Sequence, residues 1–390
     1  MNKSTKNISV KTYLVGGFVR NLLLKKYLNL DLPPTDKDFL VIGADRNYML
    51  SLGFIPIAKF FPIFLHPITK DEYALARTEK SIGVEHTAFK CNTKNISLKQ
   101  DLLRRDITIN AIALDVNNNQ IIDPYHGLQD LKNKIIRHVS LAFTEDPLRV
   151  LRVARFASIL VNFNIAKQTI KLMKQMADSK LLSTLSDHRV LTEITIASYY
   201  NFPIFLSTLA LTNNLILISP YLGSIFKQNS NKIISYYNQL KSDLGLLPAL
   251  ALIVIVNNLI QSKQDNQILK QLPLIKDYFP FLLSTKIIRK LSIVQSFFAL
   301  LVTTNKNCLT LLYISENLYK SEYSDVFTII YNTSQKMLLH QHLSQLAVAV
   351  KHLLNISNNI AQEIKIHCYH NLNRQEIIAI KKKIVESYYQ

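Results

Sequence analysis

Two carboxylates, Asp36 and Asp38, stand one residue apart at the start of an apolar run that ends at Ile42. Because side chains on a strand alternate between its faces, this spacing predicts that both acids point the same way. Paired carboxylates favour Mg²⁺, which takes one or two of them together with water and substrate phosphate. An isolated Asp-x-Asp is also compatible with a solvated strand end. The residues upstream therefore decide between a metal site and a solvated strand end.

Upstream of the acids, the pattern predicts a strand, a glycine turn and a helix. The strand is Lys11–Val15, the turn is Gly16-Gly17, and helical character begins at Val19. Paired glycines let a phosphate approach the backbone, and the helix N-terminus offers free N–H groups and a positive dipole end. Arg20 adds a fork for phosphate oxygens. A purely structural turn fits the glycines alone, but beside Asp36 and Asp38 the turn indicates a nucleotide site.

A third acid is expected on a later strand. Glu72–Glu79 reads as one strand, and Glu79 at its end is a candidate third acid near the metal, the alternative being a surface glutamate. No periodicity follows from Lys80 to Lys94, so we expect a loop there that is long enough to move.

The next basic residues, Arg104 and Arg105, end a predicted helix, Leu98–Arg105, and precede a predicted strand, Ile107–Leu114. The strand forms a hairpin with Gln120–Ile122. The side chains of adjacent residues point in different directions, so only one of Arg104 and Arg105 can face the same ligand as Arg20. We expect this to be Arg105, with Asp106 orienting it.

A second informative stretch begins at Asp146-Pro147, which marks a helix start. Asp146, Arg149, Arg152 and Arg155 recur every third residue on one face of that helix. Three arginines on one stripe, with an acid at the helix N-terminus, predict an anionic ligand that carries a base.

The Asp146/Arg149 pair suggests how that base is chosen. Cytosine and adenine both present an exocyclic amine beside a ring-nitrogen acceptor, whereas uracil and guanine present a carbonyl and an N–H. One carboxylate and one arginine could thus accept C and A while rejecting U and G, with protein side chains acting as the template.

Composition favours a polyanionic partner and a chain of more than one domain. The 390 residues exceed what one core usually organises. Lys+Arg number 46 against 27 Asp+Glu, a formal charge of +19, which favours nucleic acid as partner, although a lysine-rich proteome would also raise it. Three scattered cysteines predict neither disulfides nor a zinc site. With no leader-like apolar segment and no run long enough to span a bilayer, we expect a cytoplasmic protein that works away from membranes.

Taken together, these stretches resemble those of the class II, bacterial-type tRNA nucleotidyltransferases, the CCA-adding enzymes of the polymerase-β-like superfamily. The resemblance runs from residue 12 to about residue 160. It is carried by Leu14–Arg20, Asp36-Lys37-Asp38, Phe61–Pro67, Glu72–Glu79, Arg104–Ala111, Ile122–Gly127 and Glu145–Arg149, with a weaker match at His188–Glu193.

The resemblance implies a residue-by-residue site. Asp36 and Asp38 would hold Mg²⁺, and Asp146 and Arg149 would select the base. The remaining contacts to the incoming nucleotide would come from Gly17, Arg20, Arg105, Arg152 and Arg155. The implied reaction is attack of the tRNA 3′-hydroxyl on the α-phosphate of CTP or ATP, with release of pyrophosphate.

The implied fold class is α+β, with a mixed β-sheet in an N-terminal nucleotidyltransferase head, followed by an all-α neck, body and tail. The head spans residues 1–139, the neck 140–200, and the tRNA-binding body and tail 201–390. Long segments with few helix breakers in the last part, such as Lys286–Thr303, Leu338–Leu354 and Arg374–Ser387, are consistent with helices.

Alternatives remain open at this level. A bacterial poly(A) polymerase shares the head, a CC-only or A-only nucleotidyltransferase shares the head motifs, and an RNA-binding protein could retain the fold without catalysis. Phe61–Pro67 favours the CCA enzyme, and Asp36, Asp38 and Glu79 favour catalysis. Asn21 departs from the family, which usually has Asp there. We expect no protein partner and, because no His-Asp dipeptide occurs, no phosphohydrolase activity.

Overall fold

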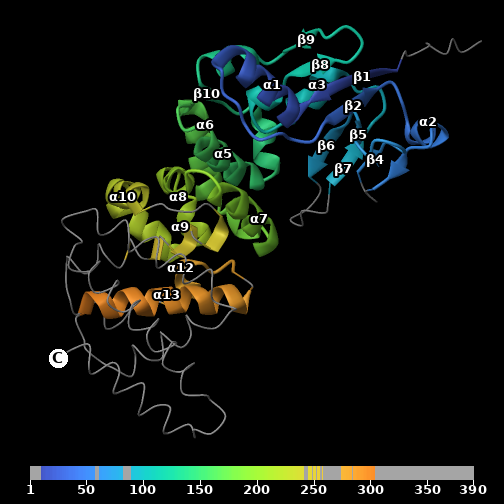
Figure 1. Ribbon diagram of the computed structural model, residues 1–390. Helices are drawn as coiled ribbons and strands as arrows, with labels where there is room; N and C mark the ends of the chain where they lie inside the picture. Colours follow the sequence, from blue (N-terminus) through green and yellow to red (C-terminus); the bar gives the residue numbers. More distant parts are fainter. Residues whose placement is uncertain are drawn as a thin grey trace, which may run out of the picture. The chain divides into compact units, whose positions relative to one another are not determined.

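The computed structural model describes residues 10–303 except 58–60, 82–88, 241–244, 248, 252, 255–256, 258–273 and 283. The chain divides into two compact units (Figure 1). The first unit runs to Ser186 and includes Thr212–Asn214, and the second comprises Asp187–Leu211 and the chain from Leu215. The division into head, neck and body at residues 139 and 200 stays a prediction.

A mixed seven-stranded sheet forms the centre of the first unit, in the order β3-β4-β5-β2-β1-β8-β9 (Figure 1). β2 and β5 run parallel, and the other neighbours are antiparallel. Its strands are β1 (Lys11–Val15), β2 (Asp38–Ile42), β3 (Ile55–Pro56), β4 (Ile63–Leu65), β5 (Glu72–Leu75), β8 (Ala113–Asp115) and β9 (Ile121–Ile122). The predicted α+β class with a mixed sheet in the head is confirmed.

The predicted strand, glycine turn and helix are confirmed, and they set the place of the acids. β1 ends at Val15, and α1 (Gly16–Leu28) begins at the next residue. Val15 is the register partner of Asp38 in the β1–β2 pair, so the glycine turn begins beside the first residue of β2. Asp36 precedes the strand, so only Asp38 of the two acids lies on it.

Helices make up most of the remainder of the described chain. In the first unit they are α2 (Arg46–Ser51), α3 (Leu98–Leu103), α4 (Gly127–Lys132), α5 (Leu148–Ile159) and α6 (Lys167–Asp178), with short 3-10 turns at Thr108–Asn110, Leu141–Glu145 and Leu181–Thr184. In the second unit they are α7 (Asp187–Ser198), α8 (Phe202–Leu211), α9 (Leu215–Ile218), α10 (Pro220–Leu240), α12 (Ile275–Tyr278) and α13 (Thr285–Thr303). The predicted helices Leu338–Leu354 and Arg374–Ser387 lie outside the described residues. Of the helices that are described, none combines the length and apolarity needed to cross a bilayer.

Two predicted strands are wrong in part. The single strand expected over Glu72–Glu79 is divided into β5 and β6 (Thr78–Ser81), which belong to different sheets. The division falls at Arg77, whose backbone N–H donates to the carboxylate of Asp101 at 3.1 Å instead of to a strand. β6 pairs with β7 (Phe89–Asn92), so the loop expected from Lys80 to Lys94 begins and ends as a hairpin.

The strand expected over Ile107–Leu114 also differs. Thr108–Asn110 form a buried 3-10 turn, and only β8 at the end of this stretch is extended. Side-chain bonds explain the turn, since Asn110 donates to Asp106 at 3.0 Å and Thr108 donates to Asp130 at 2.8 Å. The hairpin with Ile121–Ile122 is confirmed in a shorter form.

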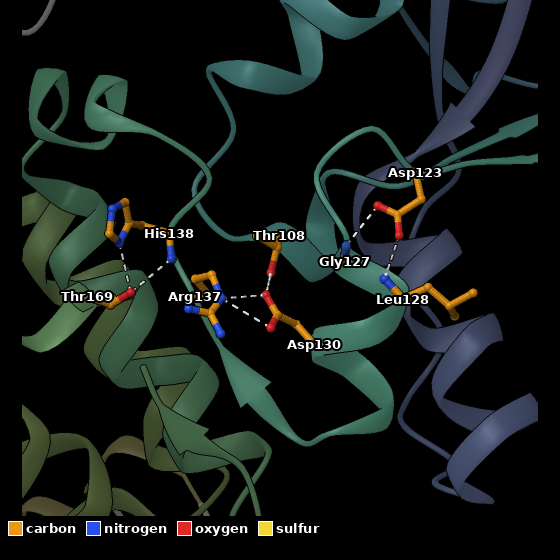
Figure 2. Close-up of polar contacts among 8 residues, drawn as sticks. All are labelled: Thr108, Asp123, Gly127, Leu128, Asp130, Arg137, His138 and Thr169. Carbon is orange, nitrogen blue, oxygen red and sulfur yellow. Dashed lines mark hydrogen bonds and ion pairs between the residues drawn. The ribbon is translucent and has the colours of Figure 1, made fainter. Parts of the chain in front are cut away.

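A buried polar network joins the end of the sheet domain to the helices that follow it (Figure 2). Asp130 on α4 accepts from Thr108 and from Arg137 Nε, the latter at 2.9 and 3.1 Å. The next residue, His138, donates its backbone N–H to the Thr169 hydroxyl on α6 at 3.0 Å. These contacts fix the segment between α4 and α5, and so help to place α5 with its arginines.

Candidate active site

Asp38 and Arg105 both face the glycine turn. A β-carbon built on Gly16 would lie 3.1 Å from Asp38 Oδ2 and 3.4 Å from Arg105 Nη1. Gly16 also has φ of +71°, a conformation that L-residues with a side chain rarely adopt. The glycine is therefore required by both space and backbone geometry, and it lets a carboxylate and a guanidinium lie close to the helix start.

Two other acids, Glu72 and Asp36, lie near the Asp38 carboxylate. Burial raises the pKa of Asp38, the charges of Glu72 and Asp36 raise it further, and the charges of Arg105 and Arg152 oppose them. Glu72 lies directly across from Asp38 in the parallel β2–β5 pair. A carboxylate beside other acids favours a bound cation, and Asp36 with Asp38 could supply oxygen ligands to a divalent metal. In the part of the chain that the structure describes, no group of three or more His, Cys, Asp or Glu forms a closed metal cage.

Asp101, and not Asp106, holds Arg105. The fully buried Asp101 carboxylate lies 3.5 Å from Arg105 Nη2 and accepts from Arg104 Nη2 at 2.7 Å. Burial alone would raise the pKa of Asp101, but the neighbouring guanidiniums of Arg104 and Arg105 lower it. The expectation that Asp106 orients Arg105 is therefore wrong, since the paired acid lies four residues earlier on α3.

The Arg20 side chain on α1 donates hydrogen bonds to two asparagines. Its Nε and Nη2 donate to Asn21 Oδ1 at 3.0 and 2.8 Å, and its Nη1 donates to Asn110 Oδ1 at 2.9 Å. Asn21 Nδ2 in turn donates to the carbonyl of Pro33 at 3.1 Å. Asn at position 21 therefore keeps a contact to Arg20 and adds a donor toward the segment that leads into Asp36.

Asp106 connects Arg20 to the arginines of α5. Its Oδ2 accepts from Arg152 Nε and Nη2 at 2.8 and 2.7 Å, while its Oδ1 accepts from Asn110 and from the backbone N–H of Ile107. Burial alone would raise the pKa of Asp106, but Arg152 and these hydrogen bonds bring it far below its ordinary value. Arg20, Asn110, Asp106 and Arg152 thus form one continuous polar chain.

The predicted base-selecting pair lies at the start of α5, which begins after Pro147 as expected. Asp146 Oδ1 accepts from the backbone N–H of Leu148 at 3.1 Å. The Arg149 guanidinium, which is largely buried, donates to the backbone carbonyl of Ala142 in the preceding 3-10 turn. Both side chains are thus held by the backbone around the helix start.

All the predicted site residues lie in the first unit. Asp36, Asp38, Arg105 and Arg152 share one electrostatic neighbourhood, and Arg20 and Arg152 share the polar chain. Gly17 follows Gly16 at the turn, and a β-carbon on it would lie 3.3 Å from the Thr35 hydroxyl. Arg155 is buried further along α5. Glu79 pairs with Cys91 in the β6–β7 hairpin, and its side chain lies outside the described ones.

Sequence reasoning missed Glu72, Asp101 and Asn110. Asp101 could have been found, because it precedes Arg104 and Arg105 by three and four residues on a predicted helix. Glu72 and Asn110 carry no such local signal. Glu72 meets Asp38 only through strand pairing, and Asn110 meets Arg20 across 90 residues of chain.

Comparisons with known proteins show similarity to CCA-adding enzymes. Residues 12–137 match the model of the poly A polymerase head domain. The CCA-adding enzyme of Buchnera aphidicola is 43% identical over 246 residues, which are 62% of this chain and 57% of that protein. The multifunctional CCA protein of Pseudoalteromonas atlantica is 52% identical over 187 residues, 47% of this chain and 44% of that protein. The chain therefore spans about half the length of these curated relatives.

Solved structures of low sequence identity agree on the fold. A tRNA-processing enzyme with CTP matches with a TM-score of 0.55 at 22% identity, covering 97% of this chain and 94% of that one. A CCA-adding enzyme with ATP matches with a TM-score of 0.54 at 19% identity, covering 97% and 86%. The resemblance predicted from the sequence is thereby confirmed. Residues 12–137 match the poly A polymerase head domain, and the chain has the fold of the solved CCA-adding enzymes.

Proposed function

We propose that the protein is a tRNA nucleotidyltransferase that adds CCA to the 3′ end of tRNA from CTP and ATP. In this reaction the tRNA 3′-hydroxyl attacks the α-phosphate, the new phosphodiester bond forms, and the bond to pyrophosphate breaks. The observation that carries the proposal is the meeting of the Asp38 carboxylate and the Arg105 guanidinium at Gly16, with Arg20 and Arg152 connected alongside.

The arginines and the glycine turn support binding of a nucleoside triphosphate. Gly16 and Gly17 open the 13-residue helix α1, whose first N–H groups are available to phosphate oxygens. Arg20, Arg105, Arg152 and Arg155 are the proposed guanidinium contacts to the triphosphate. Their side chains are held in place before any ligand binds, which lowers the entropy cost of ordering them around the substrate.

Asp36 and Asp38 are the proposed ligands of Mg²⁺, and the matched head domain supports a divalent metal in general terms. Mg²⁺ held there would neutralise charge that develops on the reacting phosphate. Glu79 was the third acid expected from the sequence, and Glu72 is the described acid next to Asp38. The site's own contribution is to align the triphosphate and to offset its negative charge with fixed guanidiniums.

Base selection is proposed for Asp146 and Arg149. Their positions at the start of α5 lie three residues apart, so an acceptor and a donor fork can meet one Watson–Crick edge. The backbone contacts at Leu148 and Ala142 support a defined starting position for both side chains.

The substrate RNA is proposed to be the acceptor arm and 3′ end of tRNA. The formal charge of +19 and the names of the relatives, a CCA-adding enzyme and a multifunctional CCA protein, support this assignment. The helical remainder is the proposed RNA-binding part. We also propose that the protein acts in the cytoplasm, without a protein partner.

Incorporation of labelled CTP and ATP, separately and together with Mg²⁺, tests the proposal. One tRNA transcript lacks its CCA end and a second ends in CC. The proposal expects addition to the first transcript to need both nucleotides and to stop after three residues, and addition to the second to stop after one A.

Other outcomes assign the protein elsewhere. Unlimited A addition would indicate a poly(A) polymerase, which shares the head domain. Addition of CC alone or A alone would indicate a division of labour, and tRNA binding without incorporation would indicate a binding protein.

A further inference from the structure

Three arginines surround one aromatic ring in the first unit. The guanidinium carbons of Arg155, Arg20 and Arg152 lie 4.5, 5.1 and 5.7 Å from the centroid of the Phe156 ring. Arg20 comes from α1, and the other two flank the ring on α5. Phe156 is 3% exposed, so the ring is a buried centre that these side chains share.

The arrangement places like charges around one point. Three guanidiniums within 6 Å of a common centroid repel one another, and the repulsion is stronger where water is excluded. Asp106 offsets part of this charge through Arg152, and Asn110 holds the edge of Arg20. The negative face of an aromatic ring attracts guanidinium groups within about 6 Å. Phe156 therefore supplies both a stacking surface and an attraction that holds the guanidiniums together.

These same three arginines are the proposed contacts to the incoming nucleotide. We infer that Phe156 is a positioning residue, which holds Arg20, Arg152 and Arg155 as one preformed receptor for the nucleotide. The inference rests on the proposed function. Phe156 itself touches no substrate in this account and acts only through the arginines.

A purely structural role for Phe156 makes a different prediction. A core phenylalanine contributes apolar area and volume, so only its size and shape would matter. A positioning ring contributes its electron density as well. Replacing ring hydrogens by fluorine lowers that density with little change in volume, and this separates the two roles.

The experiment uses the full-length chain with mono-, di- and trifluorophenylalanine at position 156, together with Phe156→Leu. Phe205→Leu is the matched control, because Phe205 is fully buried in the second unit. Equilibrium binding of CTP and of ATP is measured without tRNA, and thermal unfolding and tRNA binding are measured in parallel. Kinetics then separate the nucleotide KM from kcat.

We expect nucleotide Kd and KM to rise stepwise with fluorination, reaching about tenfold in Phe156→Leu, because each step weakens the attraction to the guanidiniums. The melting temperature of the fluorinated proteins and tRNA binding should stay close to wild type. Phe205→Leu should lose stability with an unchanged nucleotide Kd.

Two results would overturn the inference and are distinguishable. If the wild type binds CTP and ATP, and fluorination leaves their Kd unchanged, Phe156 is a core residue only and the proposed function stands. If the wild type binds neither nucleotide, the proposed function fails and the inference fails with it.

Discussion

Asp38 and Glu72 stand directly opposite one another on the parallel strands β2 and β5. The Glu72 charge raises the pKa of Asp38, in addition to the larger effect of burial, so the two carboxylates lie within electrostatic reach. Glu72 is thus an acid beside Asp38 that the sequence did not single out, and the role expected of Glu79 stays a prediction.

Replacing Glu72 by Gln tests its part in the site. We expect nucleotide incorporation to fall about tenfold or more, and a higher Mg²⁺ concentration to be needed for half-maximal rate, because the site loses one negative charge that attracts the cation. Asp71→Asn is the matched control, since Asp71 precedes Glu72 in the chain and its carboxylate accepts from the Thr69 hydroxyl at 2.6 Å. A Glu72→Gln protein with wild-type rate and Mg²⁺ dependence would exclude Glu72 from the site.

Asp146→Ala should relax base selection. The acid proposed to accept the exocyclic amine of C or A is lost, so discrimination against UTP and GTP should fall by about a hundredfold or more. Competing incorporation of all four nucleotides into one transcript measures this. Asp45→Ala removes a comparable helix-capping carboxylate on α2 and should leave discrimination intact. Full discrimination in Asp146→Ala would remove this residue from the template.

Asp106→Asn should destabilise the first unit by roughly 1–2 kcal/mol at neutral pH, because Arg152, whose side chain is 36% exposed, loses the charge of the buried Asp106. The folded-state pKa of Asp106 lies below its unfolded value, so its stabilisation is present above about pH 4 and is lost as pH falls through the folded pKa. The stability gap between wild type and variant should therefore narrow in acid.

Urea unfolding at several pH values measures that gap. Asp31→Asn is the control, because its pair with Lys25 is exposed and contributes about 0.5 kcal/mol or less. A gap between the wild type and Asp106→Asn that stayed constant down to pH 3 would contradict the assigned role of the Asp106–Arg152 pair.

Gly127→Ala should lower stability by about 3 kcal/mol through a steric clash. A β-carbon there would lie 2.2 Å from the carbonyl oxygen of Thr108, within the network around α4 (Figure 2). Gly53→Ala separates clash from backbone strain, since Gly53 has φ of +80° but its β-carbon would meet only Pro67 at 3.9 Å. Its expected loss is about 1 kcal/mol. Equal melting temperatures for the two variants would contradict the steric explanation.

Local patterns in the sequence predicted the parts of the site that depend on neighbours in the chain. The glycine turn, the Asp38 strand and the α5 start at Pro147 follow from turn chemistry, alternation and helix signals. These signals depend on a few neighbouring residues, and the turn, strand and helix start that they predict are present in the structure.

The parts that depend on distant contacts could not be predicted. The backbone N–H of Arg77 donates to the Asp101 carboxylate and not to a neighbouring strand. Asn110 lies in a 3-10 turn, where its side chain donates to Asp106 and accepts from Arg20. The ring of Phe156 gathers guanidiniums from two helices. Such contacts depend on packing between segments far apart in sequence, on which propensity and periodicity carry no information.

The most direct test of the account is the 3′-end sequence of a tRNA transcript lacking CCA, after incubation of the full chain with Mg²⁺ and all four nucleotides. The account predicts that the products end in CCA and grow no further, and that Asp38→Ala still binds the transcript but leaves its end unchanged. Products that end in long A tracts, or in mixed nucleotides, would contradict it.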